Sequence, residues 1–128
     1  MNEGGPIGLV EIYLAQLKNV FEMHGVVLAY LYGSQVTGKA GLLSDVDIAV
    51  LFPRGLDKHA RFDRVLKLMS DLAGVFRRDD VSVLDLDEGA PLLNNNVRLY
   101  GRVIFCSDER ARAGFMLRAL QQYVDTEP

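Results

Sequence analysis

The sequence predicts an α/β fold, because apolar runs of strand length alternate with segments whose apolar residues recur at helical spacing. Val26–Tyr32 is a continuous apolar run rich in β-branched and aromatic residues, which indicates a strand buried on both faces. The chain has 128 residues, of which 49% are hydrophobic and 24% charged, as in ordinary globular proteins. A chain of this length can bury one core, so residues 1–128 are expected to form a single domain.

The expected helices and strands are joined by short connections. A helix over Ile7–His24 ends at Gly25, and the strand Val26–Tyr32 follows it. The other expected elements are a strand over Asp45–Phe52, a helix from Lys58, a strand over Asp80–Leu86, a helix over Leu92–Tyr100, a strand over Arg102–Cys106 and a helix over Asp108–Val124.

Two of the helices carry apolar stripes that are expected to face the core. On the helix from Lys58, which Asp57 is expected to cap, the stripe is Phe62, Val65, Leu66, Met69, Leu72, Ala73 and Phe76. On the last helix it is Ala113, Met116, Leu117, Leu120 and Tyr123. The polar run Asn94–Asn96 is expected to be exposed.

A Gly-Ser pair follows the first predicted strand. Gly33 permits a sharp turn and a close approach of the backbone. Ser34 can then cap a short helical turn that reaches Lys39. Because free backbone N–H groups at such a turn attract anions, the pair is a candidate phosphate-binding site.

Two aspartates open the second predicted strand. Asp45 and Asp47 are two residues apart and therefore share one face of the strand, with Cα atoms about 7 Å apart. Two carboxylates at that spacing can ligate Mg²⁺ together. Val46, Ile48 and Val50 point to the opposite face and are expected to anchor the strand in the core. A turn or an Asp-x-Asp alone has an equally good structural explanation, whereas their combination at this spacing indicates a metal–nucleotide site.

This combination resembles the signature of the polymerase β-like nucleotidyltransferases, G-S-x10-D-x-D. The segment SDVDIAVLF resembles their catalytic strand, and VSVLDLDEGAPLL followed by LYGRVIF resembles the minimal nucleotidyltransferases (MNT). That group includes the MntA-type antitoxins, which pair with HEPN-domain toxins. The resemblance covers Val10 to Tyr123, with the motif core at residues 26–87, and it implies a small mixed sheet flanked by helices.

The resemblance also implies a mechanism. Asp45 and Asp47 would bind Mg²⁺ that grips the triphosphate of ATP, while Gly33 and Ser34 would hold the phosphates. A hydroxyl of the partner toxin, in this family a tyrosine, would receive AMP, and the chain would act as the antitoxin. The expected partners are therefore a HEPN toxin and ATP, with no membrane and no direct nucleic-acid contact, and a homodimer or hetero-oligomer is possible.

The chain departs from the family pattern at the third carboxylate. With Leu86 in the place of the family's leucine, the position of that carboxylate is taken by Ser82, which is a poor metal ligand. Asp80, two residues earlier on the same strand face, is the candidate substitute as a metal ligand. Asp85 has the opposite parity and is expected to face away. An alternative function therefore stays open, in which a weakened or inactive domain neutralises its partner by binding alone.

The net charge and the single cysteine bear on the partners and the cellular location of the protein. A net charge of −3 and a pI near 5.3 argue against general nucleic-acid binding. One cysteine, Cys106, excludes an internal disulfide and fits a reducing, cytoplasmic location. No segment has the apolar length of a membrane span. The basic residues along the helix from Lys58, including Arg61, Arg64, Lys67 and Arg78, form either a solvated face or a docking face for an acidic partner.

Overall fold

The computed structural model describes residues 6–33 and 46–126. Its elements begin and end within one or two residues of the predicted ones. They are α1 (Pro6–Met23), β1 (Leu28–Tyr32), β2 (Val46–Leu51), α3 (Lys58–Phe76), β3 (Val81–Asp85), the short 3-10 helix η1 (Leu86–Glu88), α4 (Pro91–Tyr100), β4 (Arg102–Cys106) and α5 (Glu109–Asp125). The predicted order of helices and strands is confirmed.

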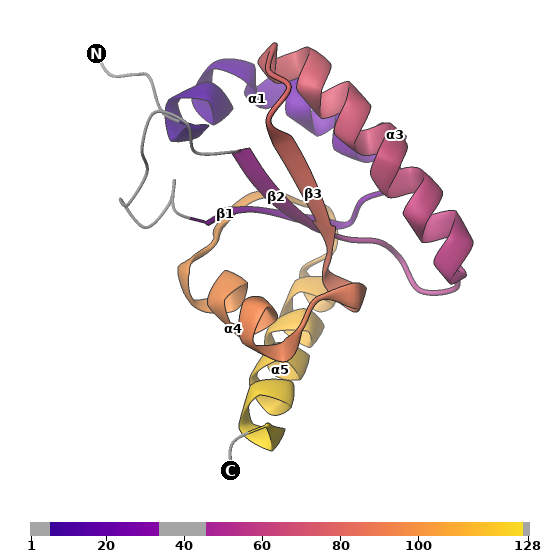
Figure 1. The fold of residues 1–128 in the computed structure, drawn as a ribbon, viewed down its shortest axis with the longest axis vertical. Coiled ribbons are helices and arrows are strands. Elements are labelled where there is room, and N and C mark those ends of the chain that lie inside the picture. Colours follow the sequence, from indigo (N-terminus) through magenta and orange to yellow (C-terminus); the bar gives the residue numbers. More distant parts are fainter. Residues whose placement is uncertain (1–5, 34–45, 127–128) are drawn as a thin grey trace.

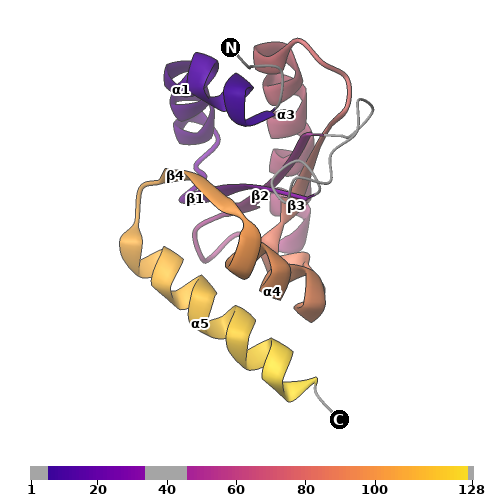
Figure 2. The ribbon, with the colours of Figure 1, turned by 90° about the vertical axis from the view of Figure 1, so that its left-hand side faces the viewer.

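The strands form one mixed sheet in the order β3-β2-β1-β4. β2 and β3 are parallel, whereas β1 runs antiparallel to both β2 and β4 (Figure 1). The helices lie on both faces of this sheet: α1 and α3 cover one face, and α4 and α5 lie on the other (Figure 2). This arrangement confirms the predicted small mixed sheet flanked by helices.

The central strands are buried on both faces, as their apolar sequences predict. Val46, Ile48 and Val50 have no exposed surface and pack in the core beneath α1 and α3. Ala49 and Leu51 belong to a second apolar cluster on the α4 and α5 face. The alternation along β2 therefore fixes which face of the sheet Asp47 occupies.

Helix α3 begins as predicted and buries most of the predicted stripe, including Val65, Leu72 and Phe76. The Asp57 side chain accepts a hydrogen bond from the Ala60 N–H at 2.8 Å, which confirms the cap. The prediction of the stripe was wrong at Phe62 and Leu66, which are 64% and 49% exposed. The side chains that α3 buries are Val65, Leu68, Leu72 and Phe76. The predicted stripe spans a wider arc of the helix than the sheet can cover.

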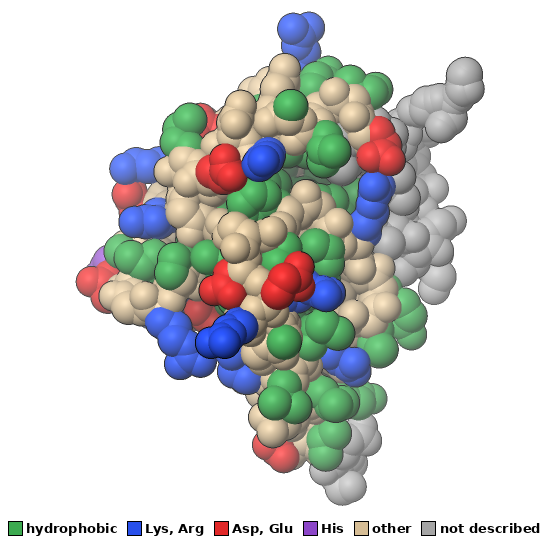
Figure 3. Space-filling model, turned by 180° about the vertical axis from the view of Figure 1, so that it is seen from behind, with side chains coloured by type: hydrophobic (Ala, Val, Ile, Leu, Met, Phe, Trp, Pro, Cys, Tyr) green, Lys and Arg blue, Asp and Glu red, His purple; other side chains and the backbone are tan. Residues whose placement is uncertain are grey.

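The prediction for the last helix was also wrong. α5 buries Phe115 and Ala119, whereas Leu117 and Leu120 are 57% and 41% exposed. Met116 is partly exposed as well, at 36%. Figure 3 shows apolar side chains gathered at the lower end of the molecule, where α5 ends. The helix therefore carries two apolar faces, and the sequence alone does not distinguish the one that packs on the sheet.

Asn94 and Asn95 are buried, contrary to the prediction of an exposed polar run. The Asn94 amide donates a hydrogen bond to the carbonyl oxygen of Leu86 at 2.9 Å. Asn95 accepts two hydrogen bonds from the guanidinium of Arg98. The Asn94 amide nitrogen thereby ties α4 to the end of β3, while Asn94 Oδ1 is buried without a hydrogen-bond partner among the described residues.

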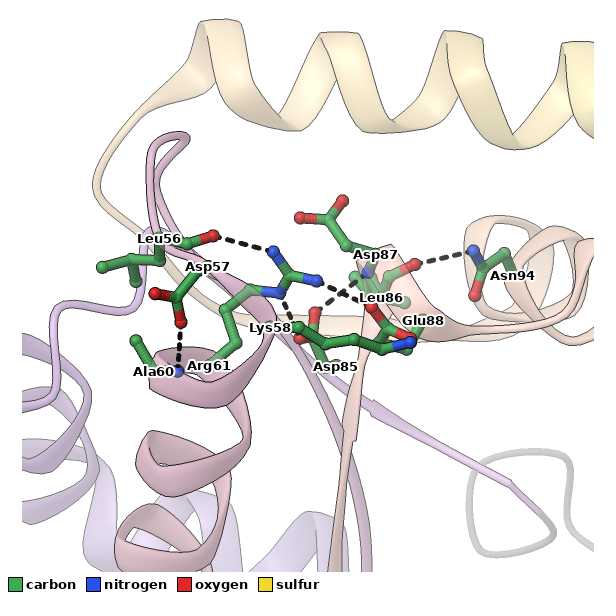
Figure 4. A network of polar contacts seen from close by, with 10 residues as sticks. All are labelled: Leu56, Asp57, Lys58, Ala60, Arg61, Asp85, Leu86, Asp87, Glu88 and Asn94. Carbon is green, nitrogen blue, oxygen red and sulfur yellow. Dashed lines mark hydrogen bonds and ion pairs between the residues drawn. The ribbon is translucent and has the colours of Figure 1, made fainter.

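The basic side chains along α3 have partners within the molecule. Arg61 donates to Asp85 at 2.9 Å and to Glu88 at 2.7 Å, and its third contact is the carbonyl oxygen of Leu56 (Figure 4). Lys67 pairs with Asp63, and Arg64 donates to the carbonyl oxygen of His24. These contacts favour a structural role for the basic residues over the docking of an acidic partner.

Arg61→Ala should lower the free energy of unfolding by about 3 kcal/mol, because it leaves the Asp85 carboxylate buried without its cation. Only 7% of the Asp85 side chain is exposed, and burial already raises the pKa of this carboxyl against the opposing effect of Arg61. Urea denaturation measures the change.

Lys67→Ala is the matched control for that experiment. It breaks an exposed ion pair on the same helix and should change stability by less than about 0.5 kcal/mol. Equal midpoints for the two variants would contradict the structural role of Arg61.

Cys106 is half-buried at the end of β4, and burial raises the pKa of its thiol. Among the helices of the described ranges, none combines the length and apolarity that crossing a membrane requires.

Candidate functional site

Asp47 lies at the edge of the sheet where β1 ends and where β2 and β3 begin. It is the second residue of β2 and is directly opposite Tyr32 on one side and Ser82 on the other. By parity its side chain is on the α4 and α5 face, and the residue is partly exposed. One carboxylate of the predicted pair thus lies near the start of a central strand, where it is accessible to solvent.

Ser82 contacts Asp47 directly. The two residues are neighbours on parallel strands, and the Ser82 hydroxyl donates a hydrogen bond to Asp47 Oδ1 at 2.7 Å. The sequence places Ser82 where the family resemblance expects a third carboxylate, and the structure shows that this position adjoins Asp47. A hydroxyl here orients the aspartate but adds no negative charge to the site.

Gly33 brings the backbone against the same carboxylate. Its φ is +91°, in the left-handed region that glycine tolerates far better than other residues. A Cβ atom at this position would lie 2.5 Å from Asp47 Oδ2. Gly33 therefore has the left-handed backbone that a sharp turn requires, and its backbone lies close to the carboxylate of Asp47.

Asp80 and Asp85 are each held by an arginine. Asp80 precedes β3, and both of its oxygens accept hydrogen bonds from Arg78, at 2.7 and 2.6 Å. These hydrogen bonds lower the pKa of Asp80. Asp85 faces Arg61 on the opposite side of the sheet, as its parity predicts. Within residues 6–33 and 46–126, no three acidic, histidine or cysteine side chains gather as a metal site would require.

The family model described as "Polymerase beta, Nucleotidyltransferase" matches residues 15–110. The chain belongs to this family. The matched residues include all four strands of the sheet, and they contain Gly33, Asp47 and Ser82. No curated protein sequence matches the chain.

Solved structures with this nucleotidyltransferase fold are similar over most of the chain. One is a toxin–antitoxin complex with AMP-PNP, at 25% identity and a TM-score of 0.66, covering 88% of this chain and 87% of that one. Another is a tri-AMPylated Shewanella oneidensis HEPN toxin in complex with an MNT antitoxin, at 25% identity and a TM-score of 0.62. That match covers 90% of this chain and 87% of the other. A third is a putative minimal nucleotidyltransferase, at 21% identity and a TM-score of 0.57. That match covers 78% of this chain and 97% of the other, and it supports the fold alone.

Asp47 has the donor chemistry that Mg²⁺ prefers, since both of its carboxylate oxygens are hard ligands and the residue is open to solvent. Its predicted partner Asp45 lies outside the described residues, as do Ser34 and the turn through Lys39. In this nucleotidyltransferase domain the described half of the site is therefore Asp47 with Gly33 and Ser82, and the metal ligands and phosphate-binding residues remain predictions.

Tyr32 is a site residue that the sequence analysis did not single out. It lies directly opposite Asp47, and its pKa is raised to about 12, first by burial and then by the negative charge of Asp47. Its position immediately before Gly33 was the available signal. A tyrosine held neutral at this edge can donate a hydrogen bond next to the carboxylate.

Tyr32 should ionise near pH 12, and this value should fall in Asp47→Asn because the Asp47 charge disfavours the phenolate. The difference in phenolate absorbance between wild type and Tyr32→Phe during alkaline titration isolates this tyrosine. Since the folded pKa exceeds the usual value of 10, the stability contributed by Tyr32 is complete below pH 10 and is lost between pH 10 and about 12. An unchanged pKa in Asp47→Asn would show that burial alone causes the shift.

Proposed function

We propose that this chain is an antitoxin that transfers AMP from ATP to a hydroxyl, expected to be a tyrosine, on a partner HEPN toxin. The observation that carries the proposal is the contact of Gly33 with Asp47 at the open edge of the central sheet. It brings Gly33, the first residue of the predicted phosphate-binding turn, close to the predicted metal ligand. The whole chain, residues 1–128, would act as one such domain.

Two similar structures support the choice of substrates. One contains AMP-PNP, an analogue of ATP, and the other contains an AMPylated HEPN toxin. Both cover most of the present chain. ATP as the donor and a HEPN protein as the acceptor therefore follow by similarity, and the HEPN toxin is also the expected binding partner.

The residues would divide the work as follows. Gly33 and Ser34 bind the phosphates of ATP, and Asp45 and Asp47 hold Mg²⁺, whose charge would offset that of the triphosphate. Ser82 keeps Asp47 in one orientation through its hydrogen bond. The acceptor oxygen forms a bond to the α-phosphorus as the bond to the leaving pyrophosphate breaks, and the acceptor proton is lost to solvent.

Incubation of the protein with its HEPN partner, Mg²⁺ and ATP labelled at the α-phosphate tests the proposal. We expect label on the partner, and loss of the partner's toxic activity in proportion to the label. Label at the γ-phosphate should never appear on the partner, because it leaves with pyrophosphate. Absence of α-label at every ATP concentration would reject nucleotidyl transfer.

A second candidate function is neutralisation of the partner by binding alone. The specific observation in its favour is Ser82, which occupies the position next to Asp47 where a third carboxylate would assist the reaction. A stable complex that silences the partner without label would support it. Ser82→Asp separates the two functions, because it should raise the rate of transfer in an active enzyme and leave a binding-only antitoxin unchanged.

A further inference from the structure

A pocket of about 600 Å³ opens at the opposite end of β2 from Asp47. Its walls are the β2–α3 connection with Arg54, the 3-10 helix with Asp87, and the first half of α5 with Arg110 and Arg118. Leu51, the last residue of β2, lines it, so about four residues of strand, roughly 13 Å, separate it from Asp47. Its volume is in the range of small-molecule sites.

Three arginines line this pocket: Arg54, Arg110 and Arg118. Other arginines of the chain, such as Arg61 and Arg78, are held in ion pairs. In the part of the chain that the structure describes, none of the three pocket arginines lies within ion-pair distance of a carboxylate. Guanidinium groups match the oxygens of phosphate two at a time, so the pocket offers donors for a phosphate.

The Arg118 side chain lies against the backbone of its own helix. A Cβ atom at Gly114, one turn earlier, would be 3.1 Å from Arg118 Nη1. The glycine thus leaves room for the guanidinium at the pocket wall. Behind the arginines the lining is apolar and comes from Val27, Leu51, Phe52 and Ala111. Such a surface suits a flat apolar group next to the phosphate.

The two acidic residues of the pocket have different roles. Asp108 Oδ1 accepts hydrogen bonds from the N–H groups of Arg110 and Ala111 and caps α5. Asp87 points toward α5, away from the network in which its neighbour Glu88 binds Arg61 (Figure 4). Among the described residues its carboxylate has no hydrogen-bond or ion-pair partner. It is therefore available to accept hydrogen bonds from a ligand.

We infer that this pocket binds a nucleoside phosphate, at a site separate from the one proposed around Asp47. The phosphate would contact the arginines, the base would rest on the apolar lining, and the ribose hydroxyls would donate to Asp87. With three guanidinium and two carboxylate groups, the pocket carries one net positive charge, which favours an anionic ligand. The inference does not depend on whether the chain transfers AMP.

Titration of the ¹⁵N-labelled protein with AMP, followed by amide chemical shifts, tests the inference. EDTA is present throughout, so that binding that depends on Mg²⁺ at Asp47 does not contribute. We expect the amide signals of Gly55 and Gly114 to shift while that of Gly33 does not. Arg118→Ala should weaken binding at least about tenfold, as loss of a charged hydrogen bond does. Lys67→Ala removes an equal charge elsewhere and should leave binding unchanged.

A second comparison tests recognition of the ribose. Wild type should bind AMP more tightly than 2′,3′-dideoxy-AMP, and Asp87→Ala should abolish that preference while its spectrum stays that of the folded protein. Inorganic phosphate that binds as tightly as AMP would overturn the nucleoside part of the inference. Shifts at Gly33 without shifts at Gly114, or equal binding by Arg118→Ala, would overturn the site itself.

Discussion

Asp47→Asn should reduce AMP transfer to the partner at least about 100-fold without unfolding the protein. The amide keeps an oxygen that can accept the hydrogen bond from Ser82, so the local geometry survives. The negative charge that would hold Mg²⁺ is lost, and with it the repulsion expected between Asp45 and Asp47. Transfer is measured with ATP labelled at the α-phosphate, and folding by thermal denaturation.

Asp45→Asn should have the same effect on transfer, since both carboxylates are proposed to bind the metal. Asp80→Asn is the informative comparison, because Asp80 already binds Arg78 through both oxygens. A loss of transfer in Asp80→Asn as large as in Asp47→Asn would show that Asp80 substitutes for the missing third carboxylate. Full activity with Asp45 and Asp47 both changed would reject the proposed mechanism.

Gly33→Ala should also abolish transfer, and it should destabilise the protein by about 1–2 kcal/mol. The destabilisation follows from placing a side chain at φ +91°. The loss of transfer follows from the position of the new Cβ atom, 2.5 Å from Asp47 Oδ2, which forces the carboxylate or the turn to move. Both effects are measured on the same purified variant, by label transfer and by urea denaturation.

Gly55→Ala is the matched control for this experiment. Gly55 has φ +99°, but a Cβ atom there would meet no atom within 4 Å. The two variants therefore share the backbone strain and differ in the clash with Asp47. If Gly55→Ala loses stability and retains transfer, the clash is responsible for the effect at Gly33. If both variants lose transfer equally, the contact between Gly33 and Asp47 has no special part in catalysis.

The described half of the site could be predicted from the sequence because its signals are local. A turn residue with a positive φ is best supplied by glycine, which explains Gly33. Alternation along a strand decides on which face of the sheet Asp47 lies. The family resemblance placed Ser82 at the position of the third carboxylate, and the parallel register of β2 and β3 shows that Ser82 is the neighbour of Asp47. Tyr32 was missed because its environment depends on a strand that lies 14 to 19 residues away.

The helix faces could not be predicted in the same way. α5 carries apolar residues on two sides, and whether Phe115 or Leu117 is buried depends on how the helix rests against α4 and the sheet. Phe62 on α3 fits the helical period of the core residues, yet it lies beyond the width of the sheet. Periodicity identifies a helix and its apolar residues, but the area available for burial is set by the neighbouring elements.

The sequence by itself determined the order of helices and strands, the mixed α/β class and the motif at Gly33 and Asp47, because these depend on backbone preferences and on residues close in the chain. Only the tertiary structure decided where the polar groups find partners. Arg61 on α3 binds Asp85 at the end of β3, 24 residues away. The pocket arginines lie together only because β2 ends beside α5. Such contacts join segments distant in sequence, and no local pattern encodes them.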